Sequence, residues 1–449
     1  MTTACLRCCE ESCGTCYPIT EVRAQCAACG SLLDVRYDWS GFDAEKLKQT
    51  WAARKTSRDP KDLSGVWRFR ELIPFLPPEA PIVTLQEGNT PLLDAPRAAT
   101  YAGLEALAFK HQGFNPTGSF KDNGMTTGVS QAVALDRKLV ACVSTGNTSA
   151  SLAAFAAYGG LRAVIFIPAG QIAAGKLAQA LEYGALTIQV QANFDGTWQL
   201  VFHLVEESGL YLLNSVNPFR VEGQKTIVVE MLEQLGWEPP DWIVLPGGNL
   251  GNCSAFGKGL REMHQLGLIQ RMPRLAVIQA EGAAPLYHLL QQAARENRPA
   301  REIGLQAIEN PQTLATAIKI GAPASWKKTL RELAATQGVC EIVNEQEIAD
   351  AKAVLGQSGI GCEPASAASL AGARKLVAQK VIRPKDRVVA VLTGNLLKDP
   401  TYTLAYHEGT LTYPREGQQL RIEPRFGNQP VSVPPDAAQI QRLLARESK

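Results

Sequence analysis

Lys121 is the residue whose setting points most directly to chemistry. It lies in residues 115–122 (Asn-Pro-Thr-Gly-Ser-Phe-Lys-Asp), a loop that leads into an expected helix. A helix N-terminus favours anions, so a lysine there is an unfavourable structural choice. A lysine that is taken out of water titrates closer to neutral pH and can act as a nucleophile or a base. The alternative is a solvated surface lysine, which is the usual state of this side chain.

Three further loops are rich in small polar residues and follow apolar, strand-like runs. They are residues 144–151, 246–252 and 392–399. Hydroxyl and amide side chains ahead of a helix can be simple caps. Together with the free N–H groups of the helix they can also hold a carboxylate or a phosphate, and glycines let the backbone close on such an anion. The residues after 246–252 lack the spacing of a Walker A motif, which argues against a P-loop.

The lysine loop resembles the motif of the fold-type-II pyridoxal-phosphate (PLP) enzymes, and most closely that of the threonine synthases. This resemblance implies that Lys121 is the Schiff-base lysine. Residues 144–151 resemble the asparagine loop of the same family. The resemblance implies that Asn147 contacts the phenolic oxygen of PLP, and that Thr148 and Ser149 help to hold the substrate carboxylate. Residues 87–93 resemble the opening motif of the group.

Two more loops fit the same family. Residues 246–252 resemble its glycine-rich phosphate loop, in a variant that we associate with threonine synthases. The resemblance assigns the cofactor phosphate to Gly247, Gly248, Asn249, Leu250 and Gly251. It also implies that the hydroxyl of Thr393 faces the pyridine nitrogen of PLP, where a neutral group tempers how far the ring withdraws electrons. Leu396 stands where the family usually has glycine.

The family substrate, O-phospho-L-homoserine, brings a second phosphate that needs cations of its own. The candidates are Lys110, Arg220 and Lys225, and a guanidinium can bind phosphate through two parallel hydrogen bonds. Arg220 is the first choice, because it comes just after the Asn-Pro break at a strand end. For one of the three we expect a solvated charge or an ion pair on a helix face instead. Glu363 also lies in a stretch that resembles the family, and we expect it to act from behind the site.

Seven of the 11 cysteines lie within the first 29 residues. Cys26-x-x-Cys29 is typical of a zinc knuckle, and a second pair would complete a closed, structural tetrahedral site. Cys5 with Cys8, or Cys13 with Cys16, could supply that pair, and the sequence does not choose between them. A degenerate ribbon without metal is the alternative, because the surplus cysteines blur the ligand set.

Apolar strand-like runs alternate with helix-like stretches through most of the chain. The runs are residues 107–110, 139–144, 161–167, 186–191, 211–214, 242–245, 275–279 and 388–392. This alternation predicts an α/β fold with parallel sheets covered on both faces, whose ligands bind beyond the carboxyl ends of the strands. The resemblance implies two doubly wound sheet domains of the tryptophan synthase β-like type.

The expected organisation has four parts. A zinc-ribbon-like segment spans residues 1–40, a connecting arm 41–84, the PLP-dependent region 85–410, and a tail 411–449 that packs on the body or on a partner subunit. A smaller domain of roughly residues 125–220 is inserted in the larger one. The formal charge of +2 and the absence of a long apolar run argue against nucleic-acid and membrane partners. We expect a cytoplasmic homodimer that acts on a small-molecule substrate.

Together these features predict a PLP-dependent lyase of threonine biosynthesis, a threonine synthase of the plant and cyanobacterial type. It would form L-threonine and phosphate from O-phospho-L-homoserine and water. Activation by S-adenosylmethionine is not expected, because the chain begins shorter than the plant enzymes. A threonine/serine dehydratase or a β-replacement enzyme of the same fold is the first alternative. The second is an inactive PLP-fold binding or regulatory protein, against which the intact Lys121, Asn147 and Thr393 argue.

Overall fold

A computed structural model describes residues 4–168, 174–192, 194–415 and 417–447, and its largest sheet has six strands in the order β12-β11-β10-β13-β5-β4. Neighbouring strands are parallel except β4, which pairs antiparallel with β5 at one edge. The strands are β4 (Leu92–Asp94), β5 (Leu107–His111), β10 (Trp242–Pro246), β11 (Arg274–Ala280), β12 (Val339–Val343) and β13 (Val388–Leu392).

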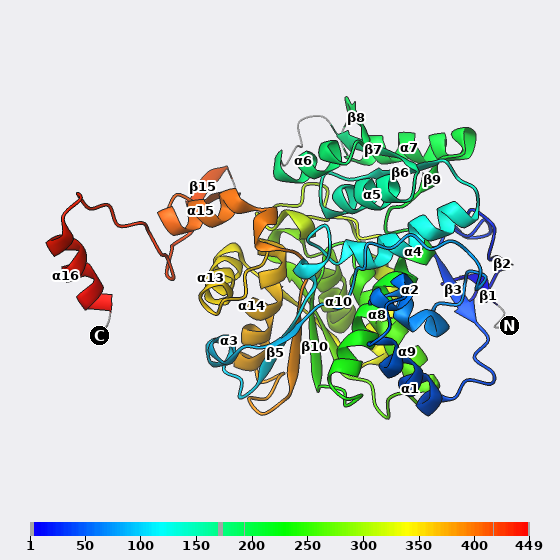
Figure 1. The fold of residues 1–449 in the computed structure, drawn as a ribbon, viewed down its shortest axis with the longest axis horizontal. Helices are drawn as coiled ribbons and strands as arrows, with labels where there is room; N and C mark the ends of the chain where they lie inside the picture. The colour runs from blue at the N-terminus through cyan, green and yellow to red at the C-terminus, as the bar shows by residue number, and fades with distance from the viewer. Residues whose placement is uncertain (1–3, 169–173, 193, 416, 448–449) are drawn as a thin grey trace.

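Helices cover both faces of this sheet (Figure 1). Alternate side chains of a strand point to opposite faces, so a strand buried on both sides is apolar throughout. In β10, Trp242 and Val244 pack with α3, α13 and α14, whereas Ile243 and Leu245 pack with α8, α9, α10 and α12. The helices are α3 (Pro96–Ala102), α8 (Pro218–Gln234), α9 (Gly251–Gln265), α10 (Pro285–Glu296), α11 (Ala300–Ile303), α12 (Trp326–Ala335), α13 (Glu345–Gln357) and α14 (Pro364–Ala378).

The second sheet has four parallel strands in the order β8-β7-β6-β9. Its four strands come between β5 and β10 in the sequence. The six-stranded sheet is therefore built from strands that precede these four and strands that follow them. The elements are β6 (Leu139–Val143), β7 (Arg162–Pro168), β8 (Leu186–Val190) and β9 (Tyr211–Leu212), with α4 (Lys121–Ala134), α5 (Asn147–Tyr158), α6 (Ala174–Glu182) and α7 (Phe194–Ser208). The exact domain boundaries remain a prediction.

The N-terminal segment folds into a small antiparallel sheet of order β2-β1-β3, followed by two helices. The elements are β1 (Ala4–Cys8), β2 (Cys16–Pro18), β3 (Leu33–Tyr37), α1 (Ala44–Arg54) and α2 (Pro60–Leu63). The sheet lies against the body, where the buried Asp34 of β3 pairs with Lys328 at 2.7 Å and with Arg331 at 2.9 Å. Both partners belong to α12, so the segment is joined to the larger sheet's helix layer.

The C-terminal part begins with α15 (Pro400–Glu408) and the hairpin β14 (Thr412–Arg415) and β15 (Gln418–Arg421). Ile422 is buried against Tyr402 and Tyr406, so the chain up to this point packs on the body. The last helix, α16 (Ala437–Glu447), stands away from the rest of the molecule at the end of an extended segment (Figure 1). Along the described parts of the chain, no helix has the length and apolarity needed to cross a bilayer.

Candidate active site and cysteine cluster

The lysine loop is joined directly to the loop after β13. The backbone N–H of Phe120 donates to Thr393 O at 3.0 Å, and Asn395 N–H donates to Gly118 O at 2.9 Å. Within the loop, Thr117 donates to the Asp122 carboxylate through both its N–H, at 2.7 Å, and its hydroxyl, at 2.6 Å. These bonds place Lys121, the first residue of α4, beside Thr393 at the carboxyl edge of the six-stranded sheet.

The surroundings of Lys121 change how its amine titrates. Loss of hydration in the pocket, and then the charge of Arg220, lower the pKa of Lys121 to about 7, although the Glu363 carboxylate opposes this shift. A large fraction of the amine is therefore unprotonated at neutral pH. An unprotonated lysine is the form that attacks a carbonyl or accepts a proton.

Glu363 connects two residues that the sequence analysis assigned to the cofactor. Asn147 Nδ2 donates to the two Glu363 carboxylate oxygens at 3.1 and 2.9 Å, and Thr393 Oγ1 donates to Glu363 at 3.1 Å. Glu363 is buried and immediately precedes α14. The expectation that it acts from behind the site agrees with these contacts.

Ser366 is a part of this arrangement that the sequence analysis did not assign. Its hydroxyl accepts from the backbone N–H groups of Thr393 at 2.8 Å and of Gly394 at 3.0 Å. It also lies 2.9 Å from Thr393 Oγ1. The sequence could have indicated Ser366 only through its position, three residues after Glu363 and in the first turn of the expected helix. Without a fold, a serine there is indistinguishable from any other small helical residue.

The loop after β6 presents polar groups toward the same pocket. Asn147 is buried, and its Oδ1 finds no hydrogen-bond partner among the described residues. Ser149 Oγ donates its proton to Gly146 O at 2.7 Å, while Thr148 is partly exposed. A buried amide oxygen without a partner is costly unless a ligand or water meets it.

The glycine loop joins the end of β10 to the start of α9. Gly247 and Gly248 are needed for packing, because an added Cβ would lie 2.5 Å from Val277 and 3.0 Å from Ile318 Cα. Leu250 adopts a left-handed backbone with φ of 64° while its side chain is buried in the core, so only its backbone can serve a ligand. The Asn249 side chain donates to Ser215 and accepts from Ala324 N–H at 2.6 Å, which fixes the loop.

The same loop fits a phosphate. The first N–H groups of a helix have no partner within the helix, and the dipole there favours an anion. A Cβ added at Gly251, the first residue of α9, would lie at an ordinary van der Waals distance of 3.8 Å from Gln224 and Ser215, so the chain is not tightly packed at this point. The buried amide nitrogen of Asn252 and the buried hydroxyl of Ser254, both possible donors, also lack partners among the described residues. Together with Lys121, Asn147 and Thr393, these groups match a phosphorylated pyridine aldehyde.

Arg220 is the one predicted substrate cation that remains open to a ligand. It is buried in the first turn of α8, and its charge acts on Lys121. Its Nη1 donates to Leu213 O at 3.0 Å, whereas Nε and Nη2 meet no acceptor in the part of the chain that the structure describes. Two such donors along one edge of a guanidinium can form two parallel hydrogen bonds to a phosphate.

The other two predicted substrate cations are engaged elsewhere, and the expectation for them is corrected. Lys110 Nζ donates to Thr90 O at 2.7 Å and to Glu230 and Gln234 at 2.8 Å, which uses all three of its hydrogens. Lys225 Nζ lies 2.6 Å from carboxylate oxygens of both Glu222 and Glu262. Both lysines are fully buried, and burial requires such partners for a charge. Two of the three candidates, not one, are structural.

Comparison with known proteins agrees with this geometry. Residues 83–394 match the family model described as "Pyridoxal-phosphate dependent enzyme". A threonine synthase of Methanosarcina acetivorans is 46% identical over 88% of this chain and 92% of its own length. One from Synechocystis is also 46% identical, over 75% of this chain and 85% of its own.

The chain belongs to the threonine synthase family of PLP-dependent enzymes. It is therefore a PLP-dependent lyase, and the expected α/β fold class is confirmed. A serine ammonia-lyase of Rhizomucor miehei superposes with a TM-score of 0.61 at 21% identity, over 72% of this chain and 99% of that chain. Maize serine racemase gives 0.59 at 21% identity, over 72% of this chain and 92% of that one. At these identities the two structures show the shared fold alone.

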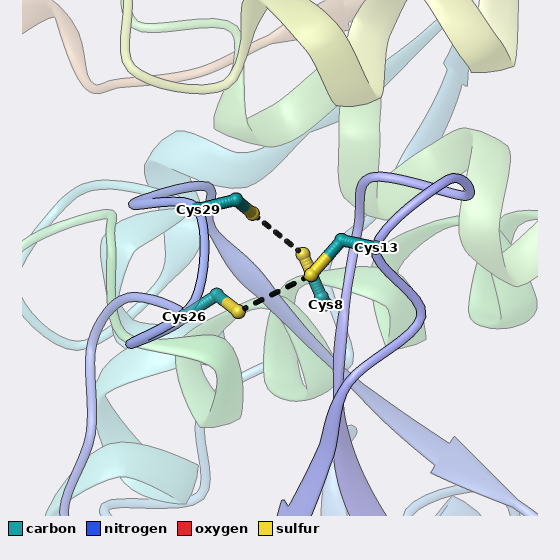
Figure 2. A group of neighbouring side chains, drawn as sticks. All are labelled: Cys8, Cys13, Cys26 and Cys29. Atoms are coloured by element: carbon teal, nitrogen blue, oxygen red, sulfur yellow. Dashed lines mark hydrogen bonds between the residues drawn. The ribbon is translucent and has the colours of Figure 1, made fainter.

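The N-terminal cysteines form a compact group outside this site. The Sγ atoms of Cys8, Cys13, Cys26 and Cys29 all lie within 4.8 Å of one another (Figure 2). Cys8 and Cys29 are 3.4 Å apart and Cys13 and Cys26 are 3.7 Å apart. Zinc–sulfur bonds of about 2.3 Å in a tetrahedron separate the sulfurs by about 3.8 Å. The group takes one cysteine from each of the two pairs that the sequence left open.

Proposed function

We propose that this chain converts O-phospho-L-homoserine and water to L-threonine and phosphate. The observation that carries the proposal is that the buried Arg220 beside Lys121 has no acceptor for its Nε and Nη2 among the residues that the structure describes. A dehydratase acting on threonine or serine has no second phosphate to bind and needs no such cation. The identity of 46% to proteins named threonine synthase supports the same reaction.

Each element of the site would hold one part of the cofactor. Lys121 would be its covalent anchor, and the N-terminus of α9, with the backbone of residues 247–251, would bind its phosphate. Asn147 would meet the phenolic oxygen and Thr393 the pyridine nitrogen. When bound, PLP supplies an electron sink that makes the protons next to the substrate's amine and at Cβ removable.

The chain's own residues would then handle protons and orientation. Lys121 takes and returns protons at the substrate's carbon atoms, which suits an amine with a pKa of about 7. Thr148 and Ser149 orient the carboxylate, for which the Ser149 hydroxyl turns from Gly146 O to donate to it. Arg220 holds the phosphate through its departure from Cγ. Gln179 of α6 contacts both the Lys398 ammonium and, at 3.4 Å, Thr117 O, so the smaller sheet's layer closes over the lysine loop and limits access of water.

The test is turnover by the purified, PLP-loaded chain. With O-phospho-L-homoserine we expect L-threonine and phosphate in equal amounts, and neither product from Lys121→Ala. Formation of 2-oxobutyrate from L-threonine, without phosphate release from O-phospho-L-homoserine, would assign the chain to the dehydratases instead. Failure to bind PLP or to turn over either substrate would favour an inactive binding protein.

We also propose that Cys8, Cys13, Cys26 and Cys29 bind one structural zinc ion. Four thiolates would close the coordination shell, so the metal would hold the turns together and take no part in the reaction. The ribbon touches both parts of the enzyme: Leu32 and Cys9 pack with the four-stranded sheet, and Asp34 pairs with α12 beside the six-stranded one. A metal here would stabilise the N-terminal segment, which contacts the parts of the enzyme around both sheets.

Metal analysis of the purified chain tests this proposal. We expect about one zinc per chain, lost in Cys29→Ser. Cys16→Ser is the matched control, because Cys16 is exposed, lies close in sequence and stands outside the group. Equal zinc contents in the two variants would contradict the proposed ligand set, and no zinc in the unsubstituted chain would favour the metal-free ribbon.

We further propose that the enzyme is a homodimer and works in the cytoplasm. Light scattering or sedimentation of the PLP-loaded chain would give its mass, which for a dimer is twice 48.5 kDa. A monomer at micromolar concentration would contradict this part without affecting the proposed reaction.

A further inference from the structure

A second cavity lies outside the Lys121 pocket, between α13, the residues before α14, and α15. Its volume is about 260 Å³. Ala349, Ala353 and Leu396 form apolar parts of its wall, and Lys352, Tyr402 and His407 bring polar groups to it. None of the described residues that line it carries a carboxylate.

Lys352 is unusual among the buried lysines of this chain. Its residue is 6% exposed, and its Nζ donates to Thr403 Oγ1 at 2.8 Å but forms no ion pair within the described residues. By contrast, four of the five other buried lysines, which are Lys110, Lys225, Lys258 and Lys328, are each paired directly with a carboxylate, and the fifth, Lys398, contacts Gln179. A buried cation without a close counter-charge is costly. Burial lowers the pKa of Lys352, although Cys362 and Asp399 act against the shift from a distance.

Two more groups in the wall can donate hydrogen bonds. The Tyr402 hydroxyl is buried and has no partner in the described part of the chain, and the Lys352 ammonium lies 5.9 Å from the centre of its ring. His407 Nδ1 accepts from Asn428 N–H at 3.0 Å, so the neutral ring carries its proton on Nε2. The nearby Asp350 carboxylate is already engaged by Tyr406 and Arg425.

We propose that this cavity binds a small monocarboxylate with an apolar body, no larger than an amino acid. Its carboxylate would pair with Lys352, which has no ion-pair partner among the described residues, and would accept from the Tyr402 hydroxyl, which has no hydrogen-bond partner among them. Its apolar part would lie against Ala349, Ala353 and Leu396. Anionic chemistry follows from the Lys352 ammonium, which has no carboxylate partner within the described parts of the chain, and the size limit follows from the volume of about 260 Å³.

The position of the cavity gives such a ligand a route to the active site. Cys362 in its wall directly precedes Glu363, which bonds both Asn147 and Thr393. Leu396 lies three residues after Thr393, and the backbones of Cys362 and Asn395 form an isolated antiparallel bridge. The ligand would therefore touch, from outside, the two loops that hold the cofactor ring's polar partners. The inference does not depend on which reaction the enzyme catalyses.

Calorimetric titration of the PLP-loaded enzyme with 3-methylbutanoate tests the site, and 3-methylbutan-1-ol is the uncharged probe of the same shape. We expect the carboxylate to bind and the alcohol not to. Lys352→Met should weaken binding at least tenfold, since a hydrogen-bonded charge pair is lost. The exposed Lys385→Met should bind as the unsubstituted enzyme does.

A second variant blocks the cavity without touching the charge. Gly356 on α13 is exposed and lines the cavity, and a Cβ added there would meet no described heavy atom within 4 Å outside its own helix. Gly356→Leu should therefore obstruct the cavity and weaken binding, while Gly356→Ala should retain it. None of the variants at Lys352, Lys385 and Gly356 should change the binding of PLP or of the substrate at the active site. No heat with 3-methylbutanoate, equal binding of the alcohol, or unchanged affinity in both Lys352→Met and Gly356→Leu would overturn the proposal.

Discussion

At the scale of single residues, the account depends on how the charges near Lys121 are balanced. Arg220 and Lys121 repel each other, and Glu363 offsets part of that repulsion. The sequence pointed to Lys121, Asn147 and Thr393 because each lies in a loop that resembles a family motif, and it ranked Arg220 first among the three candidate cations. It could not exclude Lys110, because the partner of Lys110 lies 120 residues away, at Glu230, and only the fold brings the two together.

The charge balance predicts the pH dependence of cofactor capture by the cofactor-free protein. The unprotonated amine is the reactive form, so the rate of capture should rise with pH and level off above a pKa of about 7. In Arg220→Met the lost positive charge should move the midpoint to higher pH and slow capture at pH 7. Stopped-flow absorbance after mixing with PLP measures this rate.

The control is Arg271→Met, which removes an exposed arginine that pairs with Asp241. The pH at which its rate of PLP capture is half-maximal should match that of the unsubstituted protein. A midpoint near the ordinary lysine value in the unsubstituted protein, or no movement in Arg220→Met, would contradict the assigned cause.

At the scale of elements, the start of α14 organises the cofactor side of the pocket. Glu363 precedes the helix and Ser366 lies in its first turn, and together they fix the loop after β13. The resemblance to the family motif indicated Glu363 but not Ser366. Ser366 accepts hydrogen bonds from backbone N–H groups, and a sequence alone does not show which backbone groups lie next to a side chain.

Ser366→Ala tests this arrangement. The buried N–H groups of Thr393 and Gly394 would lose their acceptor, so we expect a loss of about 2 kcal/mol in the free energy of unfolding. The absorbance maximum of bound PLP should also shift, because Thr393 loses a neighbour at 2.9 Å. Urea unfolding and the absorbance spectrum measure the two effects.

Ser369→Ala is the matched control, because its hydroxyl donates to Ser366 O, a bond within the helix that should change stability by less than about 1 kcal/mol. Equal effects of the two substitutions on stability and on the spectrum would show that Ser366 has no particular role at the cofactor.

The secondary structure was predictable where strands carry an apolar run. The eight expected runs all contain or overlap strands of the two larger sheets, including β8 and β9 at the edges of the four-stranded one. The strands missed in the six-stranded sheet are its two edge strands: β12 (Val339–Val343) carries Cys340 and Glu341 and is only partly buried, and β4 has only three residues. Edge strands bury one side only, so their apolar signal is weaker. The hairpin β14–β15 was missed for the same reason, since it lies largely exposed.

At the scale of the whole molecule, the N-terminal ribbon is built into the enzyme. Tyr37 of β3 donates to Glu222 on α8 at 2.8 Å, two residues beyond Arg220. The cysteine ligand set could not be read from C-x-x-C spacing, because Cys5 and Cys8 both lie in β1 and side chains three apart in a strand point to opposite faces. The pairing of β1 with β3 brings Cys8 to the knuckle instead.

The junction between ribbon and body predicts a contrast between two adjacent lysines. Lys328 is buried and pairs with Asp34 at 2.7 Å, whereas Lys327 is 40% exposed and pairs with Glu10 at 3.2 Å. Lys328→Met should lower the free energy of unfolding by about 3 kcal/mol, since it leaves a buried carboxylate with one fewer partner. Lys327→Met should cost less than about 1 kcal/mol.

Urea denaturation with limited proteolysis of the N-terminal segment measures this contrast. Lys328→Met should also release the segment to protease at lower urea than Lys327→Met does. Similar stabilities for the two variants would mean that the ribbon is only loosely attached to α12.

The account as a whole depends on Arg220 binding the phosphate of the substrate. The most direct measurement is kcat/KM for O-phospho-L-homoserine in Arg220→Met, with the affinity for PLP measured on the same preparation. We predict a loss of about 100-fold or more, mainly through KM, partly recovered in Arg220→Lys, with PLP bound as tightly as before. A kcat/KM within about twofold of the unsubstituted enzyme would contradict the account.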